Sequence, residues 1–324
     1  MNSIEHYREA FNTFMESRIQ ERDPAQLYRP MTYILQLGGK RLRPVLTLMT
    51  TDAMGGDFRE ALPAALALEM FHNFSLVHDD IMDAAPLRRG KPTVHIKWDV
   101  NTGILSGDAM LIQSYQLFEA YEPALFKALT GLFTRTALEV CEGQQYDVDF
   151  ETTEDVGIGQ YLQMIRCKTA VLLGACMKMG ASIGGASEAE QQAAYNFGLD
   201  LGIAFQLQDD YLDAFGDPET FGKQVGGDIM ENKKTYLYLK AIEMADASEI
   251  RELQQLFSIK PHDREAKVKR VCAIYEDSGA SSQTRKEIQR YTMQAFEYLD
   301  ELKLPDAAAA GFRDFGETLM ERIS

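Results

Sequence analysis

Asp79-Asp80-Ile81-Met82-Asp83 places three carboxylates within five residues, and Asp209-Asp210-Tyr211-Leu212-Asp213 repeats that arrangement about 130 residues later. Apolar side chains precede both runs. If both runs are helical, the first and last carboxylates of each share one face, because positions four apart are stacked. Like charges this close destabilise a helix unless a cation compensates them. Mg²⁺ binds one or two carboxylates and completes its shell with waters and substrate phosphates, so the two runs predict a multi-metal diphosphate site.

The same residues have simpler interpretations. One such run by itself is more often a solvated acidic face of a helix, whereas two copies beside apolar segments favour a functional pair. His72 and His78, which lie close to the first acidic run in the sequence, also have more than one possible interpretation. His78 could orient a carboxylate and His72 could reach an anion, but either could be a satisfied core histidine. Neither has the spacing of a transition-metal ligand set.

Composition narrows the class of protein. The chain has 324 residues and is 45% hydrophobic, which is ordinary for a globular protein with a sizeable core. A net charge of −16 argues against a nucleic-acid binder with a basic face and against docking on anionic lipid. The four cysteines form no CxxC pair, so we expect free thiols in a reducing compartment. Residues 1–19 have no apolar signal core and no apolar stretch reaches about 18 residues, so we expect no secretory signal, no membrane span and a cytoplasmic location.

Hydrophobic periodicity predicts an all-α protein. Apolar residues recur with the period of a helix, and the alternating runs typical of strands are few. No linker or shift in composition separates domains, so we expect a single helical domain over residues 1–324. The predicted helices are 4–22, 26–36, 44–54, 58–78, 103–119, 124–146, 153–167, 169–181, 187–215, 234–247, 249–256, 263–278, 283–301 and 307–323.

Three clusters of basic residues stand out against the acidic background. The segment GGKRLRP (38–44) lacks the GxxxxGK[ST] spacing of a Walker loop, but its Lys40 and Arg43 are three apart and could converge on one anion. Arg88 and Arg89 follow the first acidic run, and guanidinium groups suit bidentate recognition of a diphosphate. The third cluster consists of Lys168, Lys223, Lys233 and Lys234. Any one of these charges would usually be a solvated surface group, but together they predict a substrate with a charged head and an apolar tail.

With these residues in place, the chain resembles the trans-isoprenyl diphosphate synthases, also called polyprenyl synthetases, of the short-chain geranylgeranyl or farnesyl type. The resemblance covers nearly the whole length, in seven segments that follow the order of the family. They are GGKRLRP (38–44), LVHDDIMD with RRGKP (76–92), GDAML (107–111), EGQQYD (142–147), KTA (168–170), FQLQDDYLDAFGDP (205–218) and GKQVGGDIMENKKT (222–235). The implied fold is a single large helical bundle of the isoprenoid synthase type with a central active-site cavity.

The resemblance also implies roles for individual residues. Asp79 and Asp83 would coordinate two Mg²⁺ ions and Asp209 a third, with Asp80, Asp210 and Asp213 in support. Arg88, Lys168 and Lys233 would contact the allylic diphosphate, whereas Lys40, Arg43, His72 and Arg89 would hold isopentenyl diphosphate. Thr169, Gln206 and Lys223 would line the reaction centre. The implied catalytic residues are Asp79, Asp80, Asp83, Lys168, Thr169, Gln206, Asp209 and Lys223.

The implied enzyme is a short-chain trans-polyprenyl diphosphate synthase, a prenyltransferase. In such enzymes dimethylallyl, geranyl or farnesyl diphosphate loses diphosphate, the double bond of isopentenyl diphosphate attacks the allylic cation, and loss of a proton completes the step. This chemistry needs a neutralised leaving group and a dry apolar pocket. The family also implies a homodimer in which each active site lies inside one subunit.

Product length depends on the helix that precedes the first acidic run. Phe74 is five residues before Asp79, about 7.5 Å along a helix, and Ser75, four before it, is small. In the family a bulky residue near these positions is the floor of the product cavity, so one aromatic residue predicts geranylgeranyl (C20) ahead of farnesyl (C15). The chain departs from the family at Asn232, where glycine is common, and at Thr235-Tyr236-Leu237, where Thr-Leu-Pro is common.

Two other classes of protein share parts of this pattern. A class I terpene synthase has the all-α fold, the first acidic run and the Mg²⁺ chemistry, but it needs no second anion site. The presence of Lys40, Arg43 and Arg89, and of the second acidic run, argues against this class. A non-catalytic regulatory homologue should have lost carboxylates from one run, and here both runs are intact.

Overall fold

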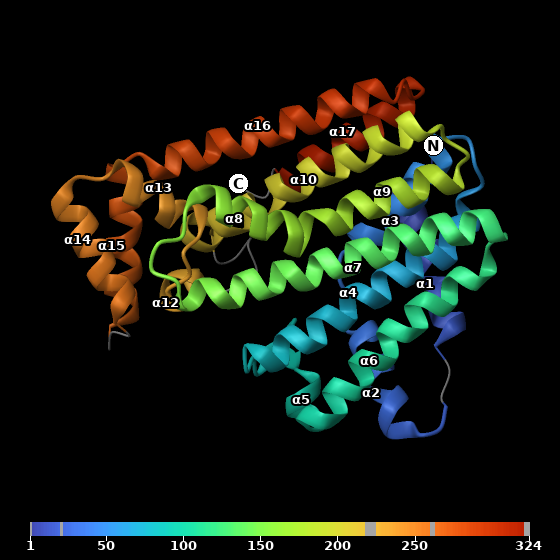
Figure 1. Ribbon diagram of the computed structural model, residues 1–324, viewed down its shortest axis with the longest axis horizontal. Helices are drawn as coiled ribbons and strands as arrows, with labels where there is room; N and C mark the ends of the chain where they lie inside the picture. Colours follow the sequence, from blue (N-terminus) through green and yellow to red (C-terminus); the bar gives the residue numbers. More distant parts are fainter. Residues whose placement is uncertain (1, 20–21, 218–224, 260–262, 321–324) are drawn as a thin grey trace. The chain divides into compact units, whose positions relative to one another are not determined.

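The computed structural model describes residues 2–19, 22–217, 225–259 and 263–320, and these residues form an almost entirely helical structure (Figure 1). Within these ranges the only strands are β1 (Leu87–Arg88) and β2 (Lys91–Pro92), which pair antiparallel. The prediction of an all-α fold is confirmed. None of the described helices is both long enough and apolar enough to cross a membrane.

The chain divides into two compact units. The first unit contains Met1–Ala137 and Ala175–Tyr195, and the second contains Leu138–Gly174 and Asn196–Ser324. The division falls within three helices, namely α7 (Pro123–Thr152), α9 (Val171–Ile183) and α10 (Glu188–Phe215). That residues 1–324 form a single domain stays a prediction.

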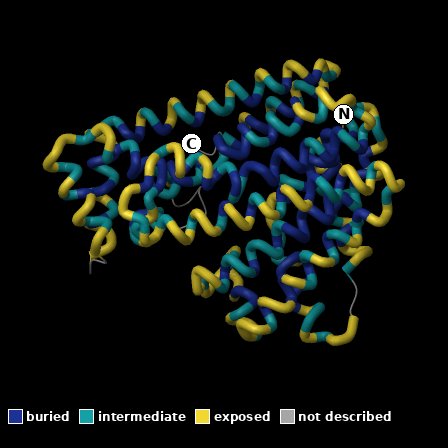
Figure 2. The backbone as a smooth tube through the Cα atoms, in the orientation of Figure 1, coloured by how far each residue is buried: buried dark blue, intermediate teal, exposed yellow. Residues whose placement is uncertain are grey.

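The first unit is built around α4. The other helices that lie wholly within the first unit are α1 (Ile4–Arg18), α2 (Ala25–Gln36), α3 (Leu42–Ala53), η1 (Phe58–Ala61), α5 (Val94–Lys97), α6 (Val100–Leu117) and η2 (Phe118–Ala120). Helix α4 (Leu62–Met82) is buried without interruption over residues 64–71 (Figure 2). It packs beside α6 (Figure 1), so the acidic run lies at the end of a helix whose middle is buried.

Two glycines allow α6 to approach the end of α4 closely. A Cβ atom on Gly103 would lie 2.9 Å from Cδ1 of Ile81, and one on Gly107 would lie 2.3 Å from Nε2 of His78. Larger residues at these positions would push α6 away from the first acidic run. The GDAML segment therefore contributes close packing to the fold, because its first residue is Gly107.

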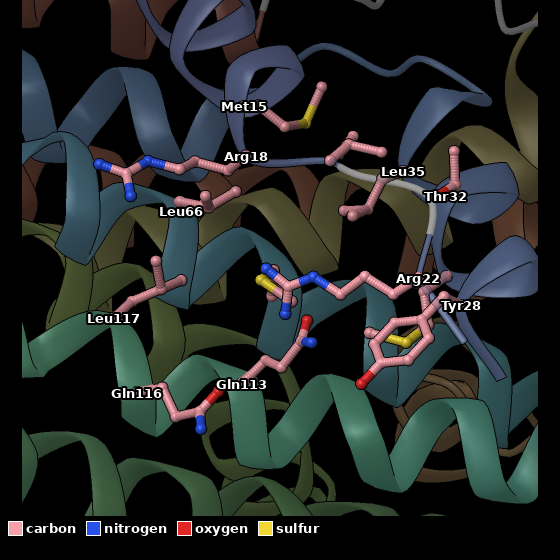
Figure 3. Close-up of a pocket in the computed structure, with 13 residues that line it drawn as sticks. Met15, Arg18, Arg22, Tyr28, Thr32, Leu35, Leu66, Gln113, Gln116 and Leu117 are labelled. Carbon is pink, nitrogen blue, oxygen red and sulfur yellow. The ribbon is translucent and has the colours of Figure 1, made fainter. Parts of the chain in front are cut away.

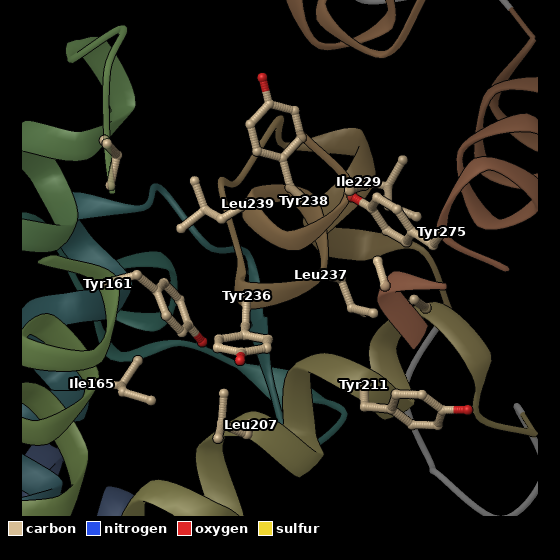
Figure 4. Packing of buried hydrophobic residues seen from close by; sticks show 14 of the residues in the cluster. Tyr161, Ile165, Leu207, Tyr211, Ile229, Tyr236, Leu237, Tyr238, Leu239 and Tyr275 are labelled. Carbon is tan, nitrogen blue, oxygen red and sulfur yellow. The ribbon is translucent and has the colours of Figure 1, made fainter. Parts of the chain in front are cut away.

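The second unit contains the other acidic run. Its remaining elements are α8 (Ile158–Ile165), the π-helical turn η3 (Arg166–Ala170), α12 (Gly227–Met230), α13 (Tyr236–Met244), α14 (Ala247–Ser258), α15 (Arg264–Asp277), α16 (Ala280–Glu301) and α17 (Asp306–Met320). Buried side chains from several of these elements form one apolar cluster, with Tyr161 beside Tyr236 and near Leu207 of α10 (Figure 4). This cluster supports the end of α10 on which the second acidic run lies.

Several predicted boundaries were wrong, and two of these differences affect the site. The predicted helix 58–78 begins as η1 and continues as α4 to Met82, so Asp79 and Asp80 lie in its last turn and Asp83 caps its end. The N–H of Asp83 bonds the carbonyl of Asp79 at 2.9 Å, which confirms that these residues lie one helical turn apart. The predicted helix 153–167 begins only at Ile158, because the N–H of Gly157 bonds the Gln160 side chain and starts a new helix.

Candidate active site

The three carboxylates of the first acidic run have different surroundings. Asp80 is 1% exposed, and its carboxylate accepts Nε of Arg88 at 2.9 Å and Nη2 at 2.8 Å. A bidentate pair with a buried carboxylate fixes the orientation of a guanidinium group. Asp79 is half-buried and Asp83 is exposed at the helix end. The geometry thus separates Asp80, which holds Arg88, from the two more accessible carboxylates.

Arg43, His72 and Arg89 come together in the first unit. Burial, and then the positive charges of Arg43 and Arg89, lower the pKa of His72 well below its ordinary value. Burial also lowers the pKa of both arginines. The Nε atom of Arg43 is buried and has no hydrogen-bond partner among the described residues. This cluster, a neutral imidazole among guanidinium groups, is therefore short of negative charge and suited to an anion.

The glycine pair before Lys40 is shaped around Arg89. Gly38 and Gly39 have φ values of +80° and +131°, and Nη1 of Arg89 donates a hydrogen bond to the Gly38 carbonyl. A Cβ atom on Gly39 would lie 3.0 Å from Cζ of Arg89. Glycine meets both demands, since it adopts positive φ freely and leaves room for the guanidinium group. Lys40 follows in the same loop and is exposed.

Arg41 differs from its basic neighbours. It is 6% exposed, its Nη1 atom lies 2.5 Å from Oε1 of Glu69, and it also donates to the carbonyl of Leu35. Glu69 is 3% exposed and also accepts the side-chain amide of Asn73 at 3.3 Å. In the sequence, Arg41 directly follows Lys40 within one basic run. In the structure, Arg41 instead forms a buried ion pair with Glu69.

Phe74 lies in a group of aromatic rings on α4. Its ring centroid is 4.7 Å from that of His78 and 5.6 Å from that of Phe71. The Ser75 hydroxyl bonds the carbonyl three residues earlier at 2.8 Å, so it stays close to the helix backbone. Nε2 of His78 lies 3.1 Å from the Ile104 carbonyl on α6. His78 therefore packs against Phe74 and α6, where its Nε2 also lies 3.9 Å from Oδ1 of Asp108.

In the second unit, η3 presents Lys168 and Thr169. Nζ of Lys168 lies 2.6 Å from Oδ2 of Asp147 on α7. A Cβ atom on Gly143 would lie 2.2 Å from the backbone nitrogen of Lys168, so this glycine allows α7 to pack directly against the turn. Short π-helical segments often occur at functional sites, and this one carries two of the predicted residues.

A chain of hydrogen bonds connects η3 to the second acidic run. The Thr169 hydroxyl donates to Oε1 of Gln206 at 3.0 Å, and Nε2 of Gln206 donates to Oδ1 of Asp210 at 2.9 Å. The Tyr161 hydroxyl donates to the other oxygen of Asp210. Both oxygens of this buried carboxylate thus have protein donors, so Asp210 serves to orient Gln206 and the end of α10.

Asp209, Asp213 and Asp228 add further carboxylates near the same end of α10. Burial and the charge of Asp213 raise the pKa of Asp228 to about 7. Burial and the charge of Asp228 raise the pKa of Asp210 well above its ordinary value. Oδ1 of Asp213 accepts the N–H of Asp228 at 2.9 Å. A divalent cation would relieve this crowding of like charges.

Lys233 lies beside these carboxylates. Its Nζ atom is 3.1 Å from Oε2 of Glu231 and 3.8 Å from Oδ1 of Asp228. Burial pulls the pKa of Lys233 down, but the two carboxylates hold it above its ordinary value, so the amine is charged. The other lysine predicted from this segment, Lys223, lies outside the described residues.

Four residues of these clusters were missing from the predicted site, namely Glu69, Asp147, Tyr161 and Asp228. Asp147 lies within the EGQQYD segment and Asp228 within the GKQVGGDIMENKKT segment. Both residues were therefore part of segments that match the family, but their residue type alone did not indicate a role in the site. Glu69 and Tyr161 lie outside all seven segments, and only their burial and partners identify them.

The donor atoms of these clusters fit magnesium. Across the described ranges, no three or more His, Cys, Asp or Glu side chains are arranged to hold a metal by themselves. Mg²⁺ does not need such an arrangement, since it retains waters and binds few carboxylates together with substrate phosphates. The oxygen-only donors of each acidic run and the crowded charge near Asp228 both suit a hard cation.

A pocket of about 180 Å³ lies elsewhere in the first unit, among α1, α2, α4 and α6 (Figure 3). Its lining includes Leu66 and Met70 of α4, and the Arg22 side chain extends across it toward Gln113 (Figure 3). With 3.6 residues per turn, Met70 is about 180° around α4 from Asp79. This pocket therefore faces away from the first acidic run and is not part of the candidate active site.

Comparison with known proteins now decides the family, because the polyprenyl synthetase family model matches residues 24–275. The chain belongs to the polyprenyl synthetase family. It is 42% identical to a geranylgeranyl pyrophosphate synthase of Geoglobus acetivorans over 235 residues, which are 72% of this chain and 73% of that protein. It is 35% identical to a short chain isoprenyl diphosphate synthase of Methanothermobacter thermautotrophicus over 311 residues, 96% of this chain and 95% of that protein. A crystal structure of geranylgeranyl pyrophosphate synthase matches with a TM-score of 0.96 and 52% identity over 100% of both chains.

Family membership confirms the predicted activity class. This polyprenyl synthetase is a short-chain trans-prenyltransferase of class EC 2.5.1, and prenyl diphosphates are its implied substrates. The family uses Mg²⁺. One relative, a geranylgeranyl pyrophosphate synthase from Corynebacterium glutamicum, was solved in complex with isoprenyl diphosphate and magnesium (TM-score 0.86, 26% identity, 98% of both chains).

Proposed function

We propose that this enzyme condenses isopentenyl diphosphate with allylic diphosphates and releases geranylgeranyl diphosphate. The full-length match at 52% identity to a geranylgeranyl pyrophosphate synthase supports this product. The observation that carries the proposal is the cationic cluster of Arg43, His72 and Arg89 within a chain of net charge −16. A site rich in guanidinium groups on so acidic a protein selects for a multiply charged anion.

This cluster is the proposed site for isopentenyl diphosphate. Arg89 is held by the Gly38 carbonyl, and Arg43 retains a buried Nε donor without a partner among the described residues. His72 is neutral at physiological pH, because burial and the surrounding arginines lower its pKa. A neutral imidazole can donate a hydrogen bond to a phosphate oxygen without adding to the repulsion among the arginines. Lys40, exposed in the adjacent loop, completes the set.

The allylic diphosphate is the proposed ligand of a second set of cations. Arg88, fixed by Asp80, would contact it, as would Lys168 and Lys233. Three Mg²⁺ ions would be held by Asp79, Asp83 and Asp209. The carboxylates that would support this set are Asp80, Asp210 and Asp213. When bound, Mg²⁺ would supply charge neutralisation for the diphosphate as it leaves.

The protein's own groups favour each bond change. Lysine and arginine donors stabilise the diphosphate as the allylic C–O bond breaks. The C4 carbon of isopentenyl diphosphate then bonds to C1 of the allylic cation, and the proton lost from C2 passes to the released diphosphate. Thr169 and Gln206, fixed by their mutual hydrogen bond, would line this centre together with Lys223, and their fixed dipoles would not need to reorganise during the reaction.

Phe74 is the proposed floor of the product cavity. Contacts with Phe71 and His78 hold its ring on α4, whereas the small Ser75 leaves its own position open. A single large ring about 7.5 Å along the helix from Asp79 is consistent with a C20 product.

The proposed assembly is a homodimer. Ile104, Leu105 and Ile112 on α6 are 41%, 60% and 62% exposed. Their spacing puts them on one face of the helix. An exposed apolar patch of this kind is typical of a protein interface, and a second copy of this chain is the occupant that the family resemblance implies.

The proposal is tested by product analysis. The protein is incubated with isopentenyl diphosphate plus dimethylallyl, geranyl or farnesyl diphosphate, with and without Mg²⁺, and the prenyl products are chromatographed. Mg²⁺-dependent elongation that stops at C20 supports the proposal, whereas accumulation at C15 or beyond C20 contradicts the product assignment. Hydrocarbon products without use of isopentenyl diphosphate would instead identify a terpene synthase, and no turnover would favour a regulatory homologue.

A further inference from the structure

Lys267 is an unusually buried lysine in α15 of the second unit, only 2% exposed. Its Nζ atom donates to Oδ1 of Asn232, lies 3.4 Å from the carbonyl oxygen of Ile259 and is 5.3 Å from the ring centroid of Phe257. Burial lowers its pKa. A buried amine destabilises the fold unless its N–H donors have acceptors. Asn232 and Ile259 supply such acceptors, so the Lys267 side chain has a defined position inside the second unit.

Asn232, the partner of Lys267, has a left-handed backbone conformation with φ at +59°. Glycine adopts this conformation without steric cost, and asparagine is among the side chains that tolerate it best. The N–H of Asn232 bonds the Ile229 carbonyl at 3.3 Å, and the N–H of Lys233 bonds the Asp228 carbonyl at 2.9 Å. The tight turn at Asn232 therefore fixes Lys233 relative to Asp228.

Helix α15 also contacts the start of the segment that runs from Gly226 to Asn232. A Cβ atom on Gly226, whose φ is +84°, would lie 2.6 Å from Cγ2 of Val268. Val268 is the next residue after Lys267, so adjacent residues of α15 contact the segment at Gly226 and at Asn232. Asp228 lies between these two contacts and Lys233 directly follows the second.

We propose that Lys267, acting through Asn232, is a positioning residue that sets the geometry with which Lys233 binds the allylic diphosphate. This inference depends on the proposed role of Lys233. Glycine would also adopt the positive φ of position 232, but it offers no side-chain oxygen to a buried amine. Asn232 and Lys267 thus act as a pair, in which each residue is effective only when the other is present.

The pair is tested with Lys267→Met, Asn232→Gly and the double variant in the full-length enzyme. Each single variant is expected to raise KM for geranyl diphosphate about tenfold, while KM for isopentenyl diphosphate stays within about twofold. The double variant should be no worse than the poorer single variant, since the two changes remove the same interaction. Lys267→Gln, which retains a donor, should restore KM for geranyl diphosphate to within about threefold of wild type.

Two controls make this test specific. Lys269→Met changes an exposed lysine of the same helix and should leave both KM values unchanged. Hydrogen exchange of the peptide covering residues 226–235 reports on the turn without relying on catalysis. It should speed up equally in Lys267→Met, Asn232→Gly and the double variant. If Lys267→Met does not fold, Asn232→Gly and Lys267→Gln still give the comparison.

Four results would overturn the inference. Effects of the two single changes that simply add in the double variant would show that the residues act independently. Equal rises in KM for both substrates would indicate a general structural role. A normal KM for geranyl diphosphate in Lys233→Ala would refute the proposed role of Lys233, and unchanged exchange in Lys267→Met would separately refute the contact itself.

Discussion

Adjacent carboxylates in each acidic run have different partners. Asp80 is buried and paired with Arg88, and Asp210 accepts hydrogen bonds from Tyr161 and Gln206. In each run the second aspartate is therefore held by protein donors. Asp79, Asp83 and Asp209 are the residues proposed to hold Mg²⁺, whereas Asp213, whose Oδ1 accepts the N–H of Asp228, is proposed to support them.

Asp79→Ala is expected to lower turnover by at least about 10³-fold, while the thermal midpoint changes by less than about 3 °C. Removal of one crowded negative charge relieves repulsion, so the fold should not suffer. Steady-state kinetics and a thermal melt check this, with Asp314→Ala, an exposed aspartate of α17, as the control. Loss of folding would mean that Asp79 has a structural role.

Arg89→Ala is expected to raise KM for isopentenyl diphosphate about 10- to 100-fold, with less than about threefold change for the allylic substrate. The reason is that a charged donor within the Arg43 and His72 cluster is lost. Initial rates measured against each substrate separately provide the comparison. Equal losses for both substrates would refute the assignment of two separate anion sites.

Asp200 provides a prediction about pH. Burial raises its pKa to about 6, against the attraction of Arg290. A carboxyl whose pKa is higher in the folded state destabilises the fold above that pKa, and the penalty disappears as pH falls toward the unfolded value. Asp200→Asn should therefore be more stable than wild type at pH 8 by on the order of 1 kcal/mol, with the advantage shrinking between about pH 6 and pH 4. Urea melts across this range check it, and a difference independent of pH would contradict it.

Helix α4 and the turn η3 show how elements place these residues. Helix α4 has a buried middle and ends at the acidic run, and Gly103 and Gly107 allow α6 to hold that end. The π-helical turn η3 packs against Gly143 and carries Lys168 and Thr169. In both cases a glycine on a neighbouring helix provides the space in which the functional segment lies.

The role of α4 in product length is tested by Phe74→Ala. Removal of the ring should deepen the proposed cavity and lengthen the main product by about one isoprene unit, since roughly five carbon atoms of volume are freed. Chromatography of the products with farnesyl diphosphate as starter measures this. Phe126→Ala on α7, where the ring is 37% exposed, is the control. An unchanged product distribution would exclude Phe74 as the floor.

For the molecule as a whole, net charge and exposed apolar surface make different predictions. A charge of −16 keeps copies apart at low salt, whereas the α6 patch of Ile104, Leu105 and Ile112 favours association. We expect the α6 patch to decide the oligomeric state. Salt screens the repulsion between the distributed charges of two copies, whereas the free energy gained by burying apolar surface is not screened.

Leu105→Glu together with Ile112→Glu should therefore convert a dimer to a monomer. Sedimentation velocity measures the oligomeric state, and Met293→Glu, which changes an exposed methionine of α16, is the control. A wild-type monomer would refute the dimer outright. A dimer that survives both substitutions would place the interface elsewhere.

Much of this protein could be predicted from local patterns. Helical periodicity predicted the all-α fold, and spacing within the acidic runs predicted that Asp79 and Asp83 lie one turn apart. The order of the seven segments predicted the family. These features depend on residues close in sequence, or on short patterns in a fixed order, so they are present before the chain folds.

Burial and partnership were decided by the tertiary structure. The sequence could not show that Arg41 pairs with Glu69 while Arg43 is left with an unpaired donor, or that Lys267 is buried against Asn232. The reason is physical: whether a charge is solvated, paired or buried depends on which distant residues pack around it. Periodicity specifies the face of a helix, but only the packed structure specifies what that face meets.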